Sequence, residues 1–198
     1  MNCITKDIEN WITGVRYCKF KKDKKHNDLE YKELNRFFKP KSRKQWTNEY
    51  GEAIVRFLLE KLDYKVNKNK SKIKVGNNTF IPDIETDDAI WEVKTRNWTT
   101  AGTAGEKVLG TPVKYSDLPT ITNKPLYIVT VAYQEYECDK YFNLFLNEND
   151  DRLANKRKIL DIFNSLNIYY IRCSDLLYRY FKKETTNEIS KNIKKYNQ

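Results

Sequence analysis

Residues 79–95 alternate between apolar side chains and charged or polar ones on both sides of an aspartate pair, Asp87-Asp88. This pattern constrains the fold more than any other in the chain, because successive side chains of a β-strand face opposite sides of a sheet. We therefore predict two strands, 79–85 and 89–95, which a tight turn at the aspartates joins into an antiparallel hairpin.

That turn determines which side chains meet across the hairpin. It pairs Ile84 with Trp91 and Asp83 with Glu92, and side chains paired in this way have Cβ atoms about 5 Å apart. Lys94 lies two residues beyond Glu92 and therefore on the same face of the sheet. Two carboxylates at that separation repel each other unless a positive charge lies between them. The hairpin therefore predicts a site for a divalent cation with an amine beside it.

The same residues have a second interpretation. The chain is 32% charged, so acids beside a lysine on an exposed strand face arise by chance in many such sequences. The case for a metal site is chemical. Mg²⁺ in proteins is usually held by one or two carboxylates together with substrate phosphate and water. Such a site suits the hydrolysis of a phosphodiester bond.

Pro82-Asp83, followed on the next strand by Glu92-Val93-Lys94, resembles the motif of the PD-(D/E)XK nuclease superfamily, which has the restriction-endonuclease-like fold. The resemblance implies an αβββαβ core: a central mixed sheet, flanked by helices, that carries the metal site on its second and third strands. It also implies that Asp83, Glu92 and the carbonyl of Val93 hold Mg²⁺, for which Mn²⁺ can substitute. Lys94 would orient the attacking water and stabilise the charge that builds up on the phosphate.

Gly51-Glu52 adds a third element to the resemblance, because the superfamily often has a glutamate on the helix before those strands. Here the pair opens an apolar helical stretch within residues 46–62. Glu52 would hold a second ion or a metal-bound water, and Glu49, one turn earlier, is the alternative. The resemblance covers about residues 46–132 and at most extends to Arg172.

The expected activity is that of a type II restriction endonuclease on double-stranded DNA, because residues 99–115 resemble small enzymes of that kind more than repair nucleases. A palindromic target would require a homodimer, and a DNA methyltransferase acting on the same site is a further expected partner. Two alternatives stay open: another PD-(D/E)XK nuclease, such as a repair nuclease, a Holliday-junction resolvase or a homing endonuclease, and a DNA-binding module without catalysis. Residues beyond the hairpin supply five candidate DNA contacts: Arg96, Asn97, Thr99, Lys107 and Lys114.

Charge points to the same class of partner. The 198 residues include 37 Lys and Arg against 27 Asp and Glu, a net charge of +10, and such an excess favours a polyanion such as nucleic acid. The basic stretch 18–44 is either a solvated surface or a clamp on the phosphate backbone. A single histidine, His26, excludes a zinc site built on histidines and makes histidine-dependent nuclease chemistry unfavourable.

The spacing of the cysteines and the hydropathy of the chain predict where the protein is located. The four cysteines are far apart in the sequence and no secretory signal is visible, so we expect free thiols in a cytoplasmic, reducing compartment. Without an apolar run long enough to span a bilayer, we expect no membrane partner. The cysteines are Cys3, Cys18, Cys138 and Cys173.

The whole chain predicts one domain, in which a basic extension (1–45) precedes the catalytic core (46–181) and a polar basic tail (182–198) frays. Residues 1–17 contain an amphipathic stretch that we interpret as a packing helix, with dimerisation as the alternative. The remaining expected helices are 46–62, 104–109, 151–166 and 174–181, and the expected strands outside the hairpin are 64–66, 73–75, 126–132 and 168–171.

Overall fold

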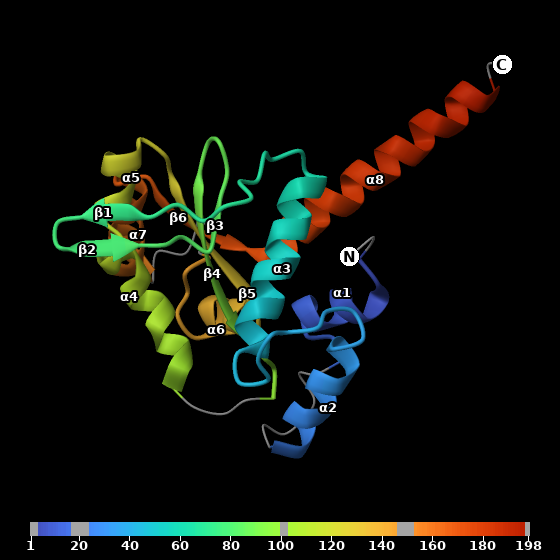
Figure 1. The fold of residues 1–198 in the computed structure, drawn as a ribbon, viewed down its shortest axis with the longest axis horizontal. Helices are drawn as coiled ribbons and strands as arrows, with labels where there is room; N and C mark the ends of the chain where they lie inside the picture. Colours follow the sequence, from blue (N-terminus) through green and yellow to red (C-terminus); the bar gives the residue numbers. More distant parts are fainter. Residues whose placement is uncertain (1–3, 17–23, 100–102, 146–152, 197–198) are drawn as a thin grey trace.

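A computed structural model describes residues 4–16, 24–99, 103–145 and 153–196. Its centre is a mixed sheet of four strands with helices on both faces (Figure 1). Within these ranges every helix is too short or too polar to cross a lipid bilayer. The expectation of a mixed α/β architecture, with helices flanking a central sheet, is confirmed.

The strands lie in the order β3, β4, β5 and β6 across the sheet. β3 runs antiparallel to β4, whereas β4, β5 and β6 run parallel to one another. β5 is buried along nearly its whole length, as its continuous apolar run predicts. The apolar sequence of residues 168–171 predicts another buried strand, but β6 lies at the edge of the sheet and only its Ile168 is buried. The bounds are β3 (Ile84–Glu85), β4 (Ile90–Arg96), β5 (Leu126–Ala132) and β6 (Ile168–Arg172).

The predicted hairpin forms with the predicted register at Ile84 and Glu85, whereas Asp83, which we expected to pair with Glu92, lies outside the ladder. Ile84 pairs with Trp91, and across the aspartate pair the amide of Thr86 donates to the carbonyl of Ala89 at 2.9 Å. A further antiparallel bridge joins Thr86 to Val66, which is what remains of the strand expected at 64–66. The turn position therefore sets the pairing, as expected from the alternating pattern.

The first arm of the hairpin is not the single strand 79–85 that we predicted. Its beginning belongs to β2 (Asn78–Phe80), which pairs with β1 (Ile73–Val75) in a separate two-stranded sheet. The chain leaves regular structure after Phe80 and re-enters it at Ile84. Pro82 lies in this break, and proline has no amide hydrogen to donate to a ladder.

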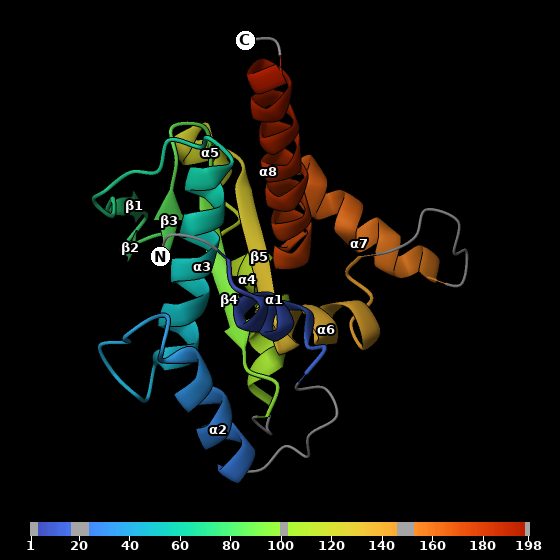
Figure 2. The ribbon, with the colours of Figure 1, turned by 90° about the vertical axis from the view of Figure 1, so that its right-hand side faces the viewer.

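Apolar side chains fill the space on both faces of the sheet. The larger group lies between the sheet and α1, α3 and α8, and it contains Ile84, Trp91 and Val93. The smaller group lies between the opposite face and α4, α6 and α7. Figure 1 shows the two layers on either side of the sheet, and Figure 2 shows α1, α3 and α8 on the near face. The bounds are α1 (Lys6–Thr13), α3 (Trp46–Lys61), α4 (Lys107–Lys114), α6 (Tyr133–Lys140), α7 (Ala154–Ser165) and α8 (Cys173–Tyr196).

The amino-terminal helix packs against the core as expected. Its apolar face buries Ile8, Trp11 and Ile12. Val15, the fourth member of the predicted apolar stripe, lies beyond the helix and is 66% exposed. The basic stretch that follows contains a further helix, α2 (Lys24–Leu34). Two short elements complete the described chain, the 3-10 turn η1 (Thr103–Glu106) before α4 and the helix α5 (Leu118–Thr122) before β5.

The last helix differs most from the expectation. We predicted that it would end at Phe181 and that residues 182–198 would fray, but α8 continues to Tyr196 and extends away from the body of the molecule (Figure 1). The sequence between Cys173 and Tyr196 has no glycine or proline to end a helix. The helix therefore extends beyond the end that we expected for it.

Gly51 allows α3 to approach β4 closely. A Cβ atom at this position would lie 1.9 Å from Oγ1 and 2.8 Å from Cβ of Thr95, the residue next to Lys94. No rotamer of Thr95 relieves the contact with its own Cβ. The absence of a side chain at Gly51 therefore sets how near α3, with Glu52, lies to the hairpin.

Gly51→Ala should lower the free energy of unfolding by about 1–3 kcal/mol, because the added methyl group overpacks the interface between helix and strand. An alanine inside a helix otherwise stabilises by up to about 1 kcal/mol relative to glycine. Gly110→Ala in α4 is the matched control, since a Cβ there meets nothing within 4 Å. Urea denaturation of both variants checks the prediction. Equal stabilisation by both alanines would contradict it.

Candidate functional site

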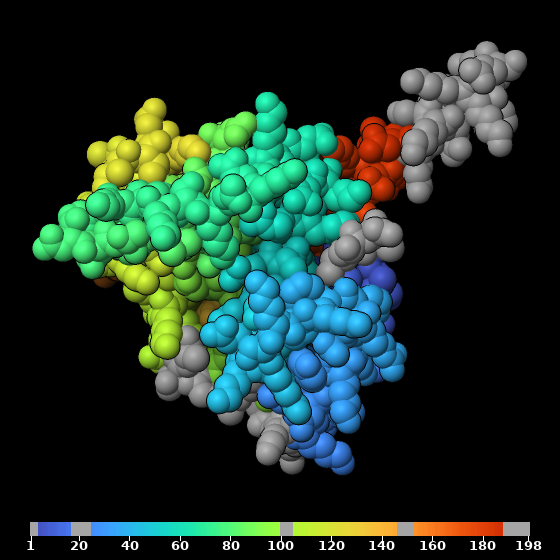
Figure 3. Space-filling view, viewed as in Figure 1, coloured from blue at the N-terminus to red at the C-terminus, as the bar shows by residue number. Residues whose placement is uncertain are grey.

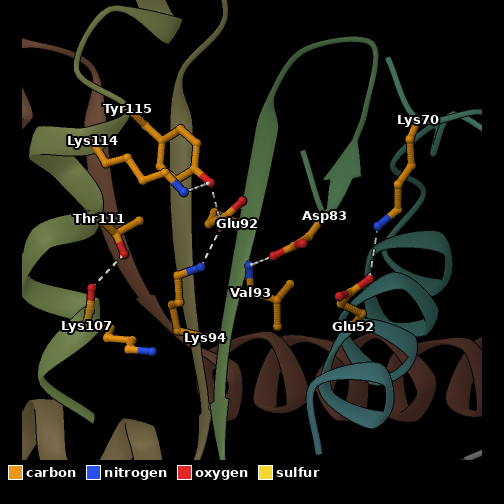
Figure 4. Close-up of polar contacts among 10 residues, drawn as sticks. All are labelled: Glu52, Lys70, Asp83, Glu92, Val93, Lys94, Lys107, Thr111, Lys114 and Tyr115. Atoms are coloured by element: carbon orange, nitrogen blue, oxygen red, sulfur yellow. Dashed lines mark hydrogen bonds and ion pairs between the residues drawn. The ribbon is translucent and has the colours of Figure 1, made fainter. Parts of the chain in front are cut away.

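Residues from α3, β4 and α4, and from the segment before β3, line a cavity of about 320 Å³. The cavity brings together four residues that we predicted to act as one site: Glu52, Asp83, Glu92 and Lys94. Figure 4 shows Glu92 on the α4 side of β4 and Asp83 on the α3 side, with Glu52 approaching from α3 on the far side of Asp83. The full lining is Asn48, Glu52, Asp83, Glu92, Val93, Lys94, Thr95, Lys107, Val108 and Gln134.

Hydrogen bonds hold the two hairpin carboxylates in place. Asp83 Oδ2 accepts from the backbone amide of Val93 at 2.8 Å. Glu92 Oε1 accepts from Lys94 Nζ at 2.5 Å and from the Tyr115 hydroxyl at 3.2 Å. The Glu92 side chain is only 8% exposed and that of Lys94 is 26% exposed. The amine is therefore already committed in part to one of the two carboxylates.

Asp83 carries the clearest sign of electrostatic strain. Burial, and after it the negative charges of Glu92 and Glu52, raise the pKa of Asp83 to about 6. The amide of Val93 and the ammonium of Lys94 oppose the shift without cancelling it. A bound cation would favour the ionised form of Asp83 and so oppose the effects of burial and of the two neighbouring carboxylates.

The structure distinguishes the two glutamates of α3. Glu52 lines the cavity and accepts from Lys70 Nζ at 3.2 Å. Glu49 points elsewhere and accepts from the backbone amide of Lys41 at 2.6 Å. Glu52 is therefore the helix carboxylate of this site, and Glu49 is not part of it.

The donor set suits a hard cation such as Mg²⁺, since it consists of carboxylate oxygens with a backbone carbonyl nearby. Within the described ranges, no three acidic, histidine or cysteine side chains converge on a single point. Asp83 and Glu92 alone meet the usual need of a Mg²⁺ site, because substrate phosphate and water complete the coordination. Glu52 would have to release Lys70 to join them.

α4 covers the other side of the cavity and places the two predicted lysines differently. Lys107 lies in the cavity lining. The ammonium of Lys114 bonds the Tyr115 hydroxyl at 3.2 Å and lies 4.7 Å from the centre of its ring. Tyr115 itself was not predicted, because one tyrosine after a helix forms no motif. Burial and the nearby charge of Glu92 raise its pKa, so the hydroxyl remains a donor to that carboxylate.

Three of the predicted DNA contacts, Arg96 at the end of β4 and Asn97 and Thr99 just after it, are buried. Arg96 forms an ion pair with Glu137 of α6, and both side chains are about one-tenth exposed or less. Gly105 closes over this pair, since a Cβ there would meet both side chains within 3 Å. Asn97 donates to Asn27 of α2. These contacts give Arg96 and Asn97 a role in holding the fold.

Thr99, the third of them, belongs to a buried network around Glu30. The Glu30 carboxylate accepts from Thr99 Oγ1 and Trp11 Nε1, both at 2.5 Å, and from the Trp98 amide at 3.1 Å. Burial raises the pKa of Glu30 although these donors oppose the shift. This network joins α1 and α2 to the loop after β4. Sequence reasoning missed it because Glu30 stands in a stretch that reads as a solvated lysine surface.

Comparison of the chain with family models, with curated proteins and with solved structures found no match.

Proposed function

We propose that this protein is a Mg²⁺-dependent endonuclease that hydrolyses phosphodiester bonds of double-stranded DNA at a specific short sequence, as type II restriction endonucleases do. One observation carries the proposal. Asp83, Glu92 and Lys94 line one cavity with Glu52, where burial, and after it the charges of Glu92 and Glu52, raise the pKa of Asp83. The net charge of +10 favours a polyanionic substrate.

The order of elements around this cavity supports a PD-(D/E)XK core. α3 comes first, followed by three chain segments paired antiparallel through Val66, β3 and β4. After them come α4 and β5, and β5 runs parallel to β4. If β1, β2 and α5 are treated as insertions and the bridge at Val66 as the first strand, this order agrees with the αβββαβ order that the resemblance implies. Asp83 and Glu92 stand on or beside its second and third strands.

In this proposal Asp83, Glu92 and the carbonyl of Val93 hold Mg²⁺, with Mn²⁺ as a substitute, and Glu52 serves a second ion or a water. The ion supplies a Lewis acid beside the scissile phosphate and lowers the pKa of a nearby water. Lys94 has N–H donors beyond the one directed at Glu92. It can therefore orient the attacking water and stabilise negative charge on the phosphate as the bond breaks.

The proposed biological context follows from the type of enzyme. Cutting both strands of a palindrome calls for a two-fold symmetric homodimer. A DNA methyltransferase that modifies the same site is the partner that would protect the host sequence.

Incubation with a long sequenced duplex and Mg²⁺, followed by mapping of the ends, tests the function. We expect discrete fragments that disappear when the metal is chelated. Nicking that depends on branched or damaged structure would favour a resolvase or a repair nuclease instead. DNA binding with no cleavage in either Mg²⁺ or Mn²⁺ would refute the nuclease and leave a DNA-binding module.

A further inference from the structure

A second cavity, of about 460 Å³, adjoins the cavity that Glu52, Asp83 and Glu92 line, which we call the carboxylate site. Asn48 and Thr95 line both cavities, so the two are neighbours on the molecule. The second one lies among α2, the start of α3 and the end of β4. Its full lining is Asn27, Arg43, Lys44, Gln45, Trp46, Thr47, Asn48, Thr95, Arg96 and Asn97.

The two cavities differ in charge. Three carboxylates and two lysines line the first, whereas the described lining of the second contains Arg43, Lys44 and Arg96 and no acidic side chain. Arg43 and Arg96 are paired with acids that lie outside the lining. In the described part of the chain Lys44 forms no ion pair, and its side chain is exposed. Lys44 therefore has positive charge available for an anionic ligand.

The polar groups around Lys44 suit a phosphate. Asn48 lines the same cavity, and asparagine side chains are common donors to the phosphate oxygens of nucleic acids. The first turn of α3 receives no hydrogen bond from a capping side chain, which leaves backbone amides there for an anion as a secondary contribution. Figure 3 shows the segment before α3, in light blue, at the surface beside α3.

The cavity is preformed by buried contacts. Asn97 is 3% exposed and bonds Asn27, and the Glu30 network ties α2 to the loop after β4. α2 therefore cannot move away from β4 without breaking buried hydrogen bonds, each of which is costly to lose. A preorganised cavity binds a ligand without first having to order its own walls.

We propose that this second cavity binds the phosphate backbone of DNA next to the phosphate that reacts at the carboxylate site. The proposal rests on the proposed function, which supplies the identity of the anion. Its consequence is a direction for the bound strand, from the carboxylate cavity past Asn48 and Thr95 to Lys44. Contacts of this kind position DNA and carry no sequence information of their own.

Binding of a duplex oligonucleotide over a series of salt concentrations, with the metal chelated, tests the subsite. Lys44→Gln should reduce the slope of log K against log salt by about one, the value for one lost phosphate contact. Lys44→Arg should retain the wild-type slope. Lys158→Gln makes the same charge change on an exposed site of α7, on the opposite face of the sheet from α3 (Figure 1), and should leave the slope unchanged.

The result separates this subsite from the nuclease itself. Equal slopes for Lys44→Gln and Lys158→Gln would overturn the subsite, even if the wild-type protein cuts DNA with Mg²⁺. A reduced slope for Lys44→Gln alone would support it, even if the wild-type protein never cuts. A wild-type protein that binds no duplex would overturn it outright.

Discussion

Lys94→Ala is expected to slow DNA cleavage by about 10²–10³-fold, the usual effect of removing one preorganised donor from the transition state. The side chain lies in the carboxylate cavity and its ammonium contacts Glu92. The variant should still bind DNA, because the other basic residues provide most of the non-specific affinity. Single-turnover cleavage at saturating protein measures the chemical step apart from binding.

Lys158→Ala is the matched control for this prediction, since it removes an exposed lysine from the far face of the sheet. It should cut at the wild-type rate. Two results would contradict the proposed role of Lys94 in cleavage. One is undiminished cutting by Lys94→Ala, and the other is equal slowing by both variants. A thermal unfolding curve for each variant confirms that a lost rate does not reflect a lost fold.

The hairpin could be predicted because its information is local. A turn at the aspartate pair forces Ile84 opposite Trp91, and strand alternation then separates the apolar face from Asp83, Glu92 and Lys94. The apolar side chains do lie in the core, and the charged ones line the cavity. Neither step requires knowledge of the rest of the chain. The break at Pro82 could have been predicted on the same local grounds.

Other features depend on partners that are distant in the sequence. Glu30 is buried because Trp11 and Thr99 bring donors to it from 19 and 69 residues away. Arg96 was predicted to be a DNA contact, but it pairs with Glu137, which is 41 residues away in the sequence. A single sequence does not show which distant residues pair. A charged residue is therefore predicted to be solvent-exposed even where it is buried. The choice of Glu52 over Glu49 likewise needed the packing of α3 against β4.

The raised pKa of Asp83 gives a pH dependence to the stability of the metal-free protein. Its folded pKa is about 6 against an ordinary value of 3.8, so between these values the native state binds more protons than the unfolded state. Stability therefore falls as pH rises from about 4 through about 6. The full loss, reached above pH 6, is roughly 3 kcal/mol for this shift, and about 2 kcal/mol of it falls between pH 4.5 and pH 8. Chemical denaturation with the metal chelated, at pH 4.5 and pH 8, measures it.

Asp83→Asn should abolish cleavage and at the same time stabilise the metal-free protein at pH 8, because it removes a buried charge that Glu92 and Glu52 disfavour. Added Mg²⁺ should raise the melting temperature of the wild-type protein at pH 8, since a ligand that binds only the native state stabilises it. The rise should shrink at pH 5, where a proton competes for Asp83.

Glu49→Gln is the control for the metal effect, because Glu49 is an acid of the same helix as Glu52 but bonds the Lys41 amide outside the cavity. It should keep the rise in melting temperature with Mg²⁺, whereas Asp83→Asn should lose it. An equal rise in both variants would place the ion somewhere other than between Asp83 and Glu92. Because the measurement needs no DNA, it tests the cation site independently of any cleavage. Stabilisation of metal-free Asp83→Asn at pH 8 then shows that the buried negative charge of Asp83 costs stability when no cation is bound.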